Sequence, residues 1–164
     1  MDFNQIYEIM EDSFPPSEIR TRQGQKKLLS CPNYKIHLKQ QNNVISGFIA
    51  TWEFNQFCFV EHLAVRFKLR GSGIGRTIIQ EYIANKNKIV ILEVEPPNKE
   101  IAVRRIGFYK RLGFILNDFE YFQPPLREGQ ELLPLKIMSY PKSISLQQFD
   151  LYISLLKTSV YSII

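Results

Sequence analysis

The sequence predicts a mixed α/β domain, and this prediction rests on three observations. Strand-like runs at 34–39, 44–54 and 57–65 are separated by short polar turns, which is typical of an antiparallel meander. A glycine-rich loop at 70–75 then opens an amphipathic segment. Beyond this loop, an apolar strand at 88–95 lies between two helical segments, which indicates a crossover in the middle of the chain.

The chain of 164 residues is 45% apolar and 23% charged, which is enough to bury one core and excludes a disordered polar chain. We therefore expect a single domain over 1–164. The net charge of +5 favours an anionic ligand only weakly. Because the basic residues are dispersed rather than clustered among aromatic residues, we expect no nucleic-acid partner.

Cysteine and histidine are too few for a disulfide framework or a histidine-rich metal site, since the chain has only Cys31, Cys58, His37 and His62. We expect no metal. No run approaches the roughly 18 apolar residues that span a membrane. Residues 1–4 also lack the features of a secretion signal. A cytoplasmic protein without a membrane partner is the expectation.

The elements before the glycine loop follow from apolar spacing and turn residues. Apolar residues at helical spacing predict a helix over 3–10, capped by Asp2. A more polar helix is predicted over 17–29. Asn42-Asn43 and Asn55-Gln56 have the composition of tight turns between the three strands.

The elements after the loop complete the order. An apolar stripe predicts a helix from Ile74, and a second helix is predicted over 98–112. Strands are predicted over 114–122 and 133–140. A last helix lies within 143–164, and the sequence leaves open whether it closes the monomer or forms a homodimer contact.

Gly71, Gly73 and Gly75 follow a strand and open a helix. Glycine permits a tight turn and close approach to a ligand, and the first amides of a helix bind anions. A phosphate or pyrophosphate is the expected ligand, with a plain strand-to-helix turn as the alternative. The Walker pattern fails, because the glycine spacing is one residue short and Arg76 replaces its lysine.

Two further loop types match in part. The dinucleotide fingerprint meets Arg76 where its third glycine belongs, which leaves a nucleotide-dependent oxidoreductase as a minor alternative. The pattern Arg/Gln-x-x-Gly-x-Gly is met in full by Arg70, Gly73 and Gly75. At this point the sequence resembles the GNAT superfamily of acetyl-CoA-dependent N-acetyltransferases.

Other segments support the resemblance over about 3–140. Residues 105–114 resemble the family's Phe-Tyr-x-x-x-Gly-Phe helix end, and residues 92–95 resemble the strand between the two motifs. The segments 121–125 and 133–138 resemble a bacterial subgroup of the family. The implied fold is a central, mostly antiparallel sheet flanked by helices, with a splayed pair of parallel strands.

The resemblance implies acetyl-CoA as cosubstrate. Its pantetheine arm would bind the backbone of one splayed strand, and its pyrophosphate would bind the glycine loop. The residues implied are Leu63, Ala64 and Val65 on the strand and Arg70, Gly71, Ser72, Gly73, Ile74, Gly75 and Arg76 in the loop. A non-catalytic acyl-CoA-binding module on the same scaffold is the main alternative to an enzyme.

The activity implied is direct acetyl transfer to a primary amine of a small molecule or peptide within a ternary complex. Tyr109 matches the family's general acid. Glu61 and Glu93 each interrupt an apolar strand face, where an unpartnered carboxylate is costly. Either is a candidate general base, or a structural partner of Arg104 or Arg105.

The strand at 57–65 also predicts which way Glu61 and His62 face. Strict alternation puts Glu61 on one face with Phe57, Phe59, Leu63 and Val65, and puts His62 on the opposite face as a core histidine.

Asn98 lies eleven residues before Tyr109 rather than the family's seven, so we expect a helix N-cap there. The acceptor is not identified by the sequence, but several acidic residues near the expected acceptor side suit a cationic amine. These are Glu8, Glu11, Asp12 and Glu18.

Overall fold

The computed structural model describes residues 2–42 and 44–163. Its α-helices are α1 (Phe3–Glu11), α2 (Arg22–Lys27), α3 (Ile74–Ala84), α4 (Glu100–Lys110) and α5 (Leu146–Ser159). Its strands are β1 (Tyr34–Gln41), β2 (Val44–Glu53), β3 (Phe57–Val65), β4 (Ile89–Val94), β5 (Ile115–Leu116), β6 (Tyr121–Gln123) and β7 (Leu133–Tyr140). Short 3-10 helices lie at Pro16–Glu18 (η1), Leu28–Ser30 (η2) and Phe67–Leu69 (η3).

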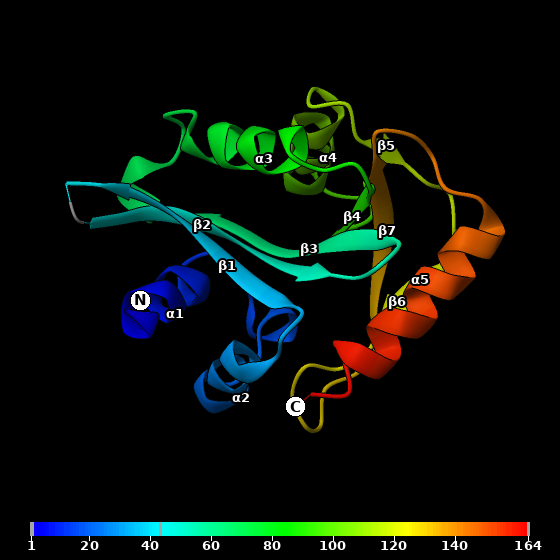
Figure 1. Ribbon diagram of the computed structural model, residues 1–164, viewed down its shortest axis with the longest axis horizontal. Coiled ribbons are helices and arrows are strands. Elements are labelled where there is room, and N and C mark those ends of the chain that lie inside the picture. The colour runs from blue at the N-terminus through cyan, green and yellow to red at the C-terminus, as the bar shows by residue number, and fades with distance from the viewer. Residues whose placement is uncertain (1, 43, 164) are drawn as a thin grey trace.

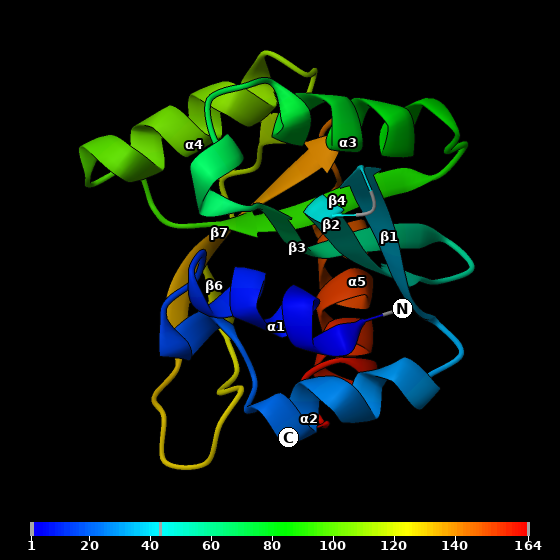
Figure 2. The same cartoon turned by 90° about the vertical axis from the view of Figure 1, so that its left-hand side faces the viewer.

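The strands form one sheet in the order β1-β2-β3-β4-β7-β5, with β6 paired to β7. Helices α3 and α4 cover one face, and α1, α2 and α5 cover the other (Figures 1 and 2). Only β3 and β4 run parallel among the pairs that the described residues form. The predicted mixed fold with a mostly antiparallel sheet is confirmed.

The parallel pair is joined along only part of its length. Residues 57–60 of β3 pair with 89–92 of β4, whereas β3 continues to Val65 with its other edge on β2. The two strands therefore part beyond Val60 and Leu92. This confirms the predicted splay and leaves backbone groups of β3 without a strand partner on one side.

A β-bulge at Glu61 changes which way the end of β3 faces. Val60 and His62 have partners in β2, but Glu61 between them is an extra residue. Phe59 therefore packs in the core under α1, α2 and α5, whereas Leu63 packs in the core under α3 and α4. The expectation that Glu61 shares a face with Leu63 is wrong, because strict alternation fails at the bulge.

Three local predictions need correction. The polar helix expected over 17–29 is interrupted, and only 22–27 is α-helical. The strand expected over 114–122 divides into β5 and β6. Between them Asn117 turns inward, and its side-chain amide bonds Ser139 Oγ at 2.9 Å and accepts from the Ile144 amide at 3.1 Å. Asn98 is not a cap, since Lys99 holds the N-cap position of α4.

Other boundaries agree closely. Helix α5 lies inside the expected 143–164 and starts at a capping box formed by Ser145 and Gln148. The turn expected at Asn42-Asn43 falls partly on Asn43, which lies outside the described residues. Over 2–42 and 44–163, no helix has the length and apolar character needed to cross a bilayer.

Candidate active site

A cavity of about 430 Å³ opens where β3 and β4 part. Its walls come from the end of β3, the end of β4, helix α4 and η1, together with Gln123, Leu126 and Tyr161. Most predicted site residues line it: Glu61, Leu63, Ala64, Val65, Arg70, Gly75, Glu93 and Tyr109. The parting of the strands thus brings the strand, loop and helix motifs to one site.

The glycine loop forms the N-terminal end of α3 at one end of this cavity. Gly71 and Gly73 have φ angles of 79° and 85°, in the left-handed region that favours glycine. Gly73 is the N-cap and supplies no side chain, so the first amides of α3 lack a side-chain acceptor. A Cβ on Gly75 would lie 3.4 Å from Val65 Cγ2, which shows how closely helix and strand approach.

The two arginines that flank this loop lie differently. The Arg70 guanidinium donates to the backbone oxygens of Asp12 and Val65 and to Ser13 Oγ, at 2.9, 3.2 and 2.9 Å. It therefore ties the loop to the ends of α1 and β3. Arg76 is exposed and forms no ion pair with any described residue.

Tyr109 is buried on α4, and its ring makes edge contacts with the rings of Phe108 and Phe114 at centroid distances of 5.1 and 5.5 Å. Its side chain lines the cavity, and its hydroxyl has no hydrogen-bond partner among the described residues. Burial raises the pKa of Tyr109 to about 12. At neutral pH it is therefore a protonated phenol available to a ligand.

Glu93, near the end of β4, has its carboxylate held by two phenols. Oε1 accepts hydrogen bonds from Tyr161 at 2.6 Å and from Tyr121. Burial raises the pKa of Glu93 to about 7, even though both hydrogen bonds favour the ionised form. A carboxyl group that titrates near neutral pH is well suited to accept a proton.

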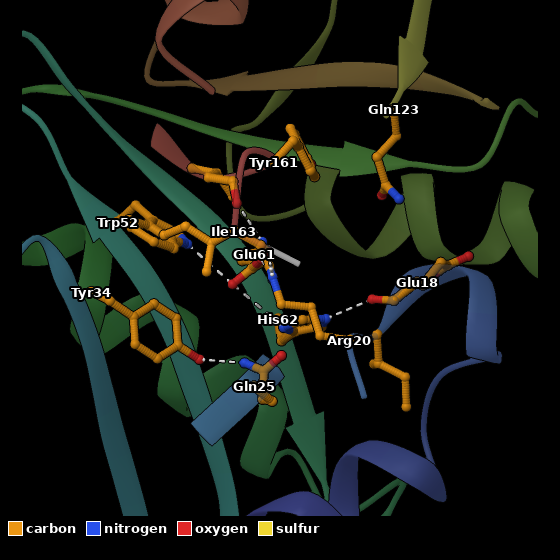
Figure 3. A network of polar contacts seen from close by, with 12 residues as sticks. Glu18, Arg20, Gln25, Tyr34, Trp52, Glu61, His62, Gln123, Tyr161 and Ile163 are labelled. Atoms are coloured by element: carbon orange, nitrogen blue, oxygen red, sulfur yellow. Dashed lines mark hydrogen bonds and ion pairs between the residues drawn. The ribbon is translucent and has the colours of Figure 1, made fainter. Parts of the chain in front are cut away.

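Glu61 is held in a buried ion pair instead. Arg20 Nη1 lies 2.5 Å from Oε1, and the two side chains are 0% and 4% exposed. Trp52 Nε1 donates to the other carboxylate oxygen at 3.1 Å (Figure 3). Burial raises the pKa of Glu61, but the Arg20 guanidinium, His62 and the hydrogen bond from Trp52 together lower it by more, so the pKa lies below its usual value.

His62 is buried, as expected of a core histidine, and its Nε2 lies 2.8 Å from the Glu18 carbonyl (Figure 3). Its ring packs against Phe14, and Nδ1 lies 3.9 Å from a Glu61 oxygen. The expectation that His62 and Glu61 occupy opposite faces is wrong, because the bulge turns both toward the same side.

Only some of the acidic residues near the expected acceptor side lie at the cavity. Glu18 and Glu95 line the cavity, whereas Glu8, Glu11 and Asp12 do not. Burial raises the pKa of Glu18.

The alternative in which Glu61 or Glu93 pairs with Arg104 or Arg105 is wrong within the described chain. Arg104 bonds Glu100 at 2.6 Å, and Arg105 makes no ion pair with either glutamate.

Sequence reasoning missed Arg20, Tyr121 and Tyr161. Arg20 stood inside a segment expected to be a solvated helix, and Tyr161 stood in an apolar C-terminal stretch. Their partners are 28 to 143 residues away in the chain. No local pattern could have found them.

No three or more His, Cys, Asp or Glu side chains come together as a metal site in the part of the chain that the structure describes.

The chain is similar in sequence to known acetyltransferases. A family model described as "Acetyltransferase (GNAT) family" matches residues 3–114. A candidate acetyltransferase of Bacillus subtilis (strain 168), YjbC, is 32% identical over 110 residues. That match covers 66% of this chain and 55% of YjbC, so the chain spans about half the length of this curated relative.

Solved structures agree. A candidate GNAT-family acetyltransferase from Bacteroides thetaiotaomicron is 32% identical, with a TM-score of 0.89 over 97% of this chain and 91% of that one. A GNAT-family acetyltransferase from Elizabethkingia anophelis, solved with acetyl-CoA bound, is 18% identical. Its TM-score is 0.55 over 73% of this chain and 82% of that one, a likeness of fold alone.

Proposed function

The chain belongs to the GNAT acetyltransferase family, and we propose that it transfers the acetyl group of acetyl-CoA directly to a primary amine of a small molecule or peptide. One observation carries the proposal. The unpaired edge of β3 beyond Val60 opens into a cavity that holds both Tyr109 and Glu93. A thioester seated in this gap has a proton donor and a proton acceptor beside it.

Acetyl-CoA fits the site through backbone groups and charge. Its pyrophosphate would lie on the first amides of α3 beside exposed Arg76, where the helix dipole favours an anion. Its amide-rich pantetheine arm would bond the free edge of β3 at Leu63, Ala64 and Val65. The acetyl-CoA bound to the Elizabethkingia protein supports this choice of cosubstrate.

The reaction needs no covalent intermediate on the protein. Glu93 accepts a proton from the substrate ammonium, and the neutral amine attacks the thioester carbonyl carbon. The tetrahedral intermediate collapses by breaking the C–S bond, and Tyr109 donates a proton to the departing thiolate. The second proton of the attacking nitrogen and the proton held by Glu93 leave to solvent, and the solvent returns one proton to Tyr109.

Glu93 is the better base of the two candidate glutamates. Its pKa near 7 lets it exchange a proton at neutral pH. Glu61 is tied to Arg20 in a buried ion pair, and protonating it would leave the guanidinium without its counter-ion. We therefore assign Glu61 a structural role.

The cavity is lined by Glu18 and Glu95 in addition to Glu93, with Arg104 and Arg105 of α4 also present. Carboxylates in the cavity attract a cationic amine over an anionic one. This supports an acceptor that arrives as an ammonium ion.

The test is the release of CoA thiol from acetyl-CoA in the presence of a panel of primary amines, with mass spectrometry of the products. We expect amine-dependent release that matches acetylated amine one to one. Glu93→Gln should lower kcat/KM by about 10²- to 10⁴-fold. Acetyl-CoA binding with no amine-dependent release across the panel would instead indicate a non-catalytic acyl-CoA-binding module.

A further inference from the structure

Arg20 connects three separate parts of the chain. Its side chain is fully buried. Nη2 donates to the Val160 carbonyl at 2.6 Å. Nη1 bonds Glu61 on β3 at 2.5 Å, and Nε donates to the Ile163 carbonyl at 2.8 Å (Figure 3). The planar guanidinium therefore binds two backbone carbonyl groups of the segment 160–163, which follows α5, and links this segment to β3 through Glu61.

The segment 160–163, which Arg20 binds, includes Tyr161 of the cavity wall. In the sequence, Tyr161 lies between Val160 and Ile163, whose carbonyl groups accept hydrogen bonds from Arg20. The Tyr161 side chain is 5% exposed and lines the cavity. Its hydroxyl donates to Glu93 Oε1 at 2.6 Å. This residue lies outside the 3–114 segment that matches the family model.

We propose that Tyr161 is a positioning residue for the Glu93 base, and that the Arg20–Glu61 ion pair holds Tyr161 in place. This inference rests on the proposed function, because it requires Glu93 to be the base. Glu61 then also influences the reaction through Arg20 and the segment 160–163, as a positioning residue.

The hydrogen bond has a defined effect on Glu93. A phenol that donates to a carboxylate stabilises the ionised form and lowers its pKa. Burial and the negative charges of Glu61 on β3 and Glu18 on η1 act in the opposite direction. The other titratable or charged groups that line the cavity are His62, Arg70, Glu95, Arg104, Arg105 and Tyr109. Tyr121 also donates a hydrogen bond to Glu93.

The experiment is the pH dependence of kcat/KM for Tyr161→Phe, which keeps the ring and removes only the hydroxyl. Without this donor the pKa of Glu93 rises. The acidic limb of the pH profile of kcat/KM should therefore move to higher pH by about one unit. Tyr152→Phe is the matched control, since Tyr152 is a buried tyrosine of α5 whose hydroxyl contacts Gln148 rather than Glu93. An acidic limb of Tyr161→Phe that coincides with that of the wild type would overturn the proposal.

Arg20→Lys tests the anchoring step. Lysine keeps the charge opposite Glu61 but lacks the fork that reaches both carbonyls. The acidic limb should move in the same direction as in Tyr161→Phe, and the double variant should show no further shift. Fully additive shifts, or no shift in Arg20→Lys, would refute the link.

Glu93→Gln separates this inference from the proposed function. If that variant keeps the acidic limb, Glu93 is not the base, and both the base assigned in the proposed function and this inference fail. If it loses the limb while Tyr161→Phe leaves the wild-type limb unchanged, only the positioning role fails.

Discussion

The Arg20 guanidinium and the Glu61 carboxylate lie 2.5 Å apart with almost no access to solvent. Removing one partner of a buried pair strands the other charge, which typically costs about 3–5 kcal/mol. We expect Glu61→Gln to lower the free energy of unfolding by about 3 kcal/mol in urea titrations at pH 7. A loss below about 1 kcal/mol would show that the pair is dispensable for stability.

The pKa of Glu93 also predicts how stability depends on pH. It lies near 7 in the folded protein against an ordinary value of 4.5, so the folded state binds more protons between these values. The contribution of Glu93 to the free energy of unfolding should therefore fall as pH rises from 4.5 to 7.

Glu93→Gln should remove this decrease in the free energy of unfolding with rising pH. The variant should therefore be more stable than the wild type at pH 8, as measured by urea titration at several pH values. Parallel curves for the two proteins across this range would contradict the raised pKa.

Tyr109→Phe should separate chemistry from binding. The ring packing with Phe108 and Phe114 survives, but the proton donor is lost. We expect kcat to fall by about 10²-fold or more, with the calorimetric affinity for acetyl-CoA unchanged. Tyr140→Phe is the control, because Tyr140 packs against Phe114 outside the cavity. Wild-type turnover in Tyr109→Phe would remove the assigned role.

Arg76→Glu should weaken acetyl-CoA binding, since it places a negative charge at the α3 N-terminal end where the pyrophosphate would lie. We expect the Kd from calorimetry to rise by about tenfold or more. Lys26→Glu makes the same change of charge on exposed α2, away from the cavity, and should leave the Kd unaltered. Equal effects of the two variants would mean that net charge alone is responsible.

Much of the fold could be predicted because the relevant signals are local. The three-strand meander, the glycine loop and the helix that carries Tyr109 follow from periodicity and turn residues over short windows. The parting of β3 and β4 was predicted from a resemblance, and the pairing confirms it.

The roles of the two glutamates depend on partners that the sequence does not bring together. Glu61 and Glu93 look alike as carboxylates on apolar strands, yet one faces Arg20 and the other faces Tyr161. A bulge at Glu61 also breaks the alternation on which the face of His62 was predicted. Such long-range contacts and single-residue register shifts leave no periodic trace in the sequence.

A crystal structure with acetyl-CoA bound tests the central claim most directly. We expect the diphosphate on the amides of 71–76, the pantetheine arm along the free edge of β3, and the thioester sulfur within hydrogen-bonding reach of the Tyr109 hydroxyl. Acetyl-CoA bound outside the gap between β3 and β4, or with its sulfur remote from Tyr109, would contradict it.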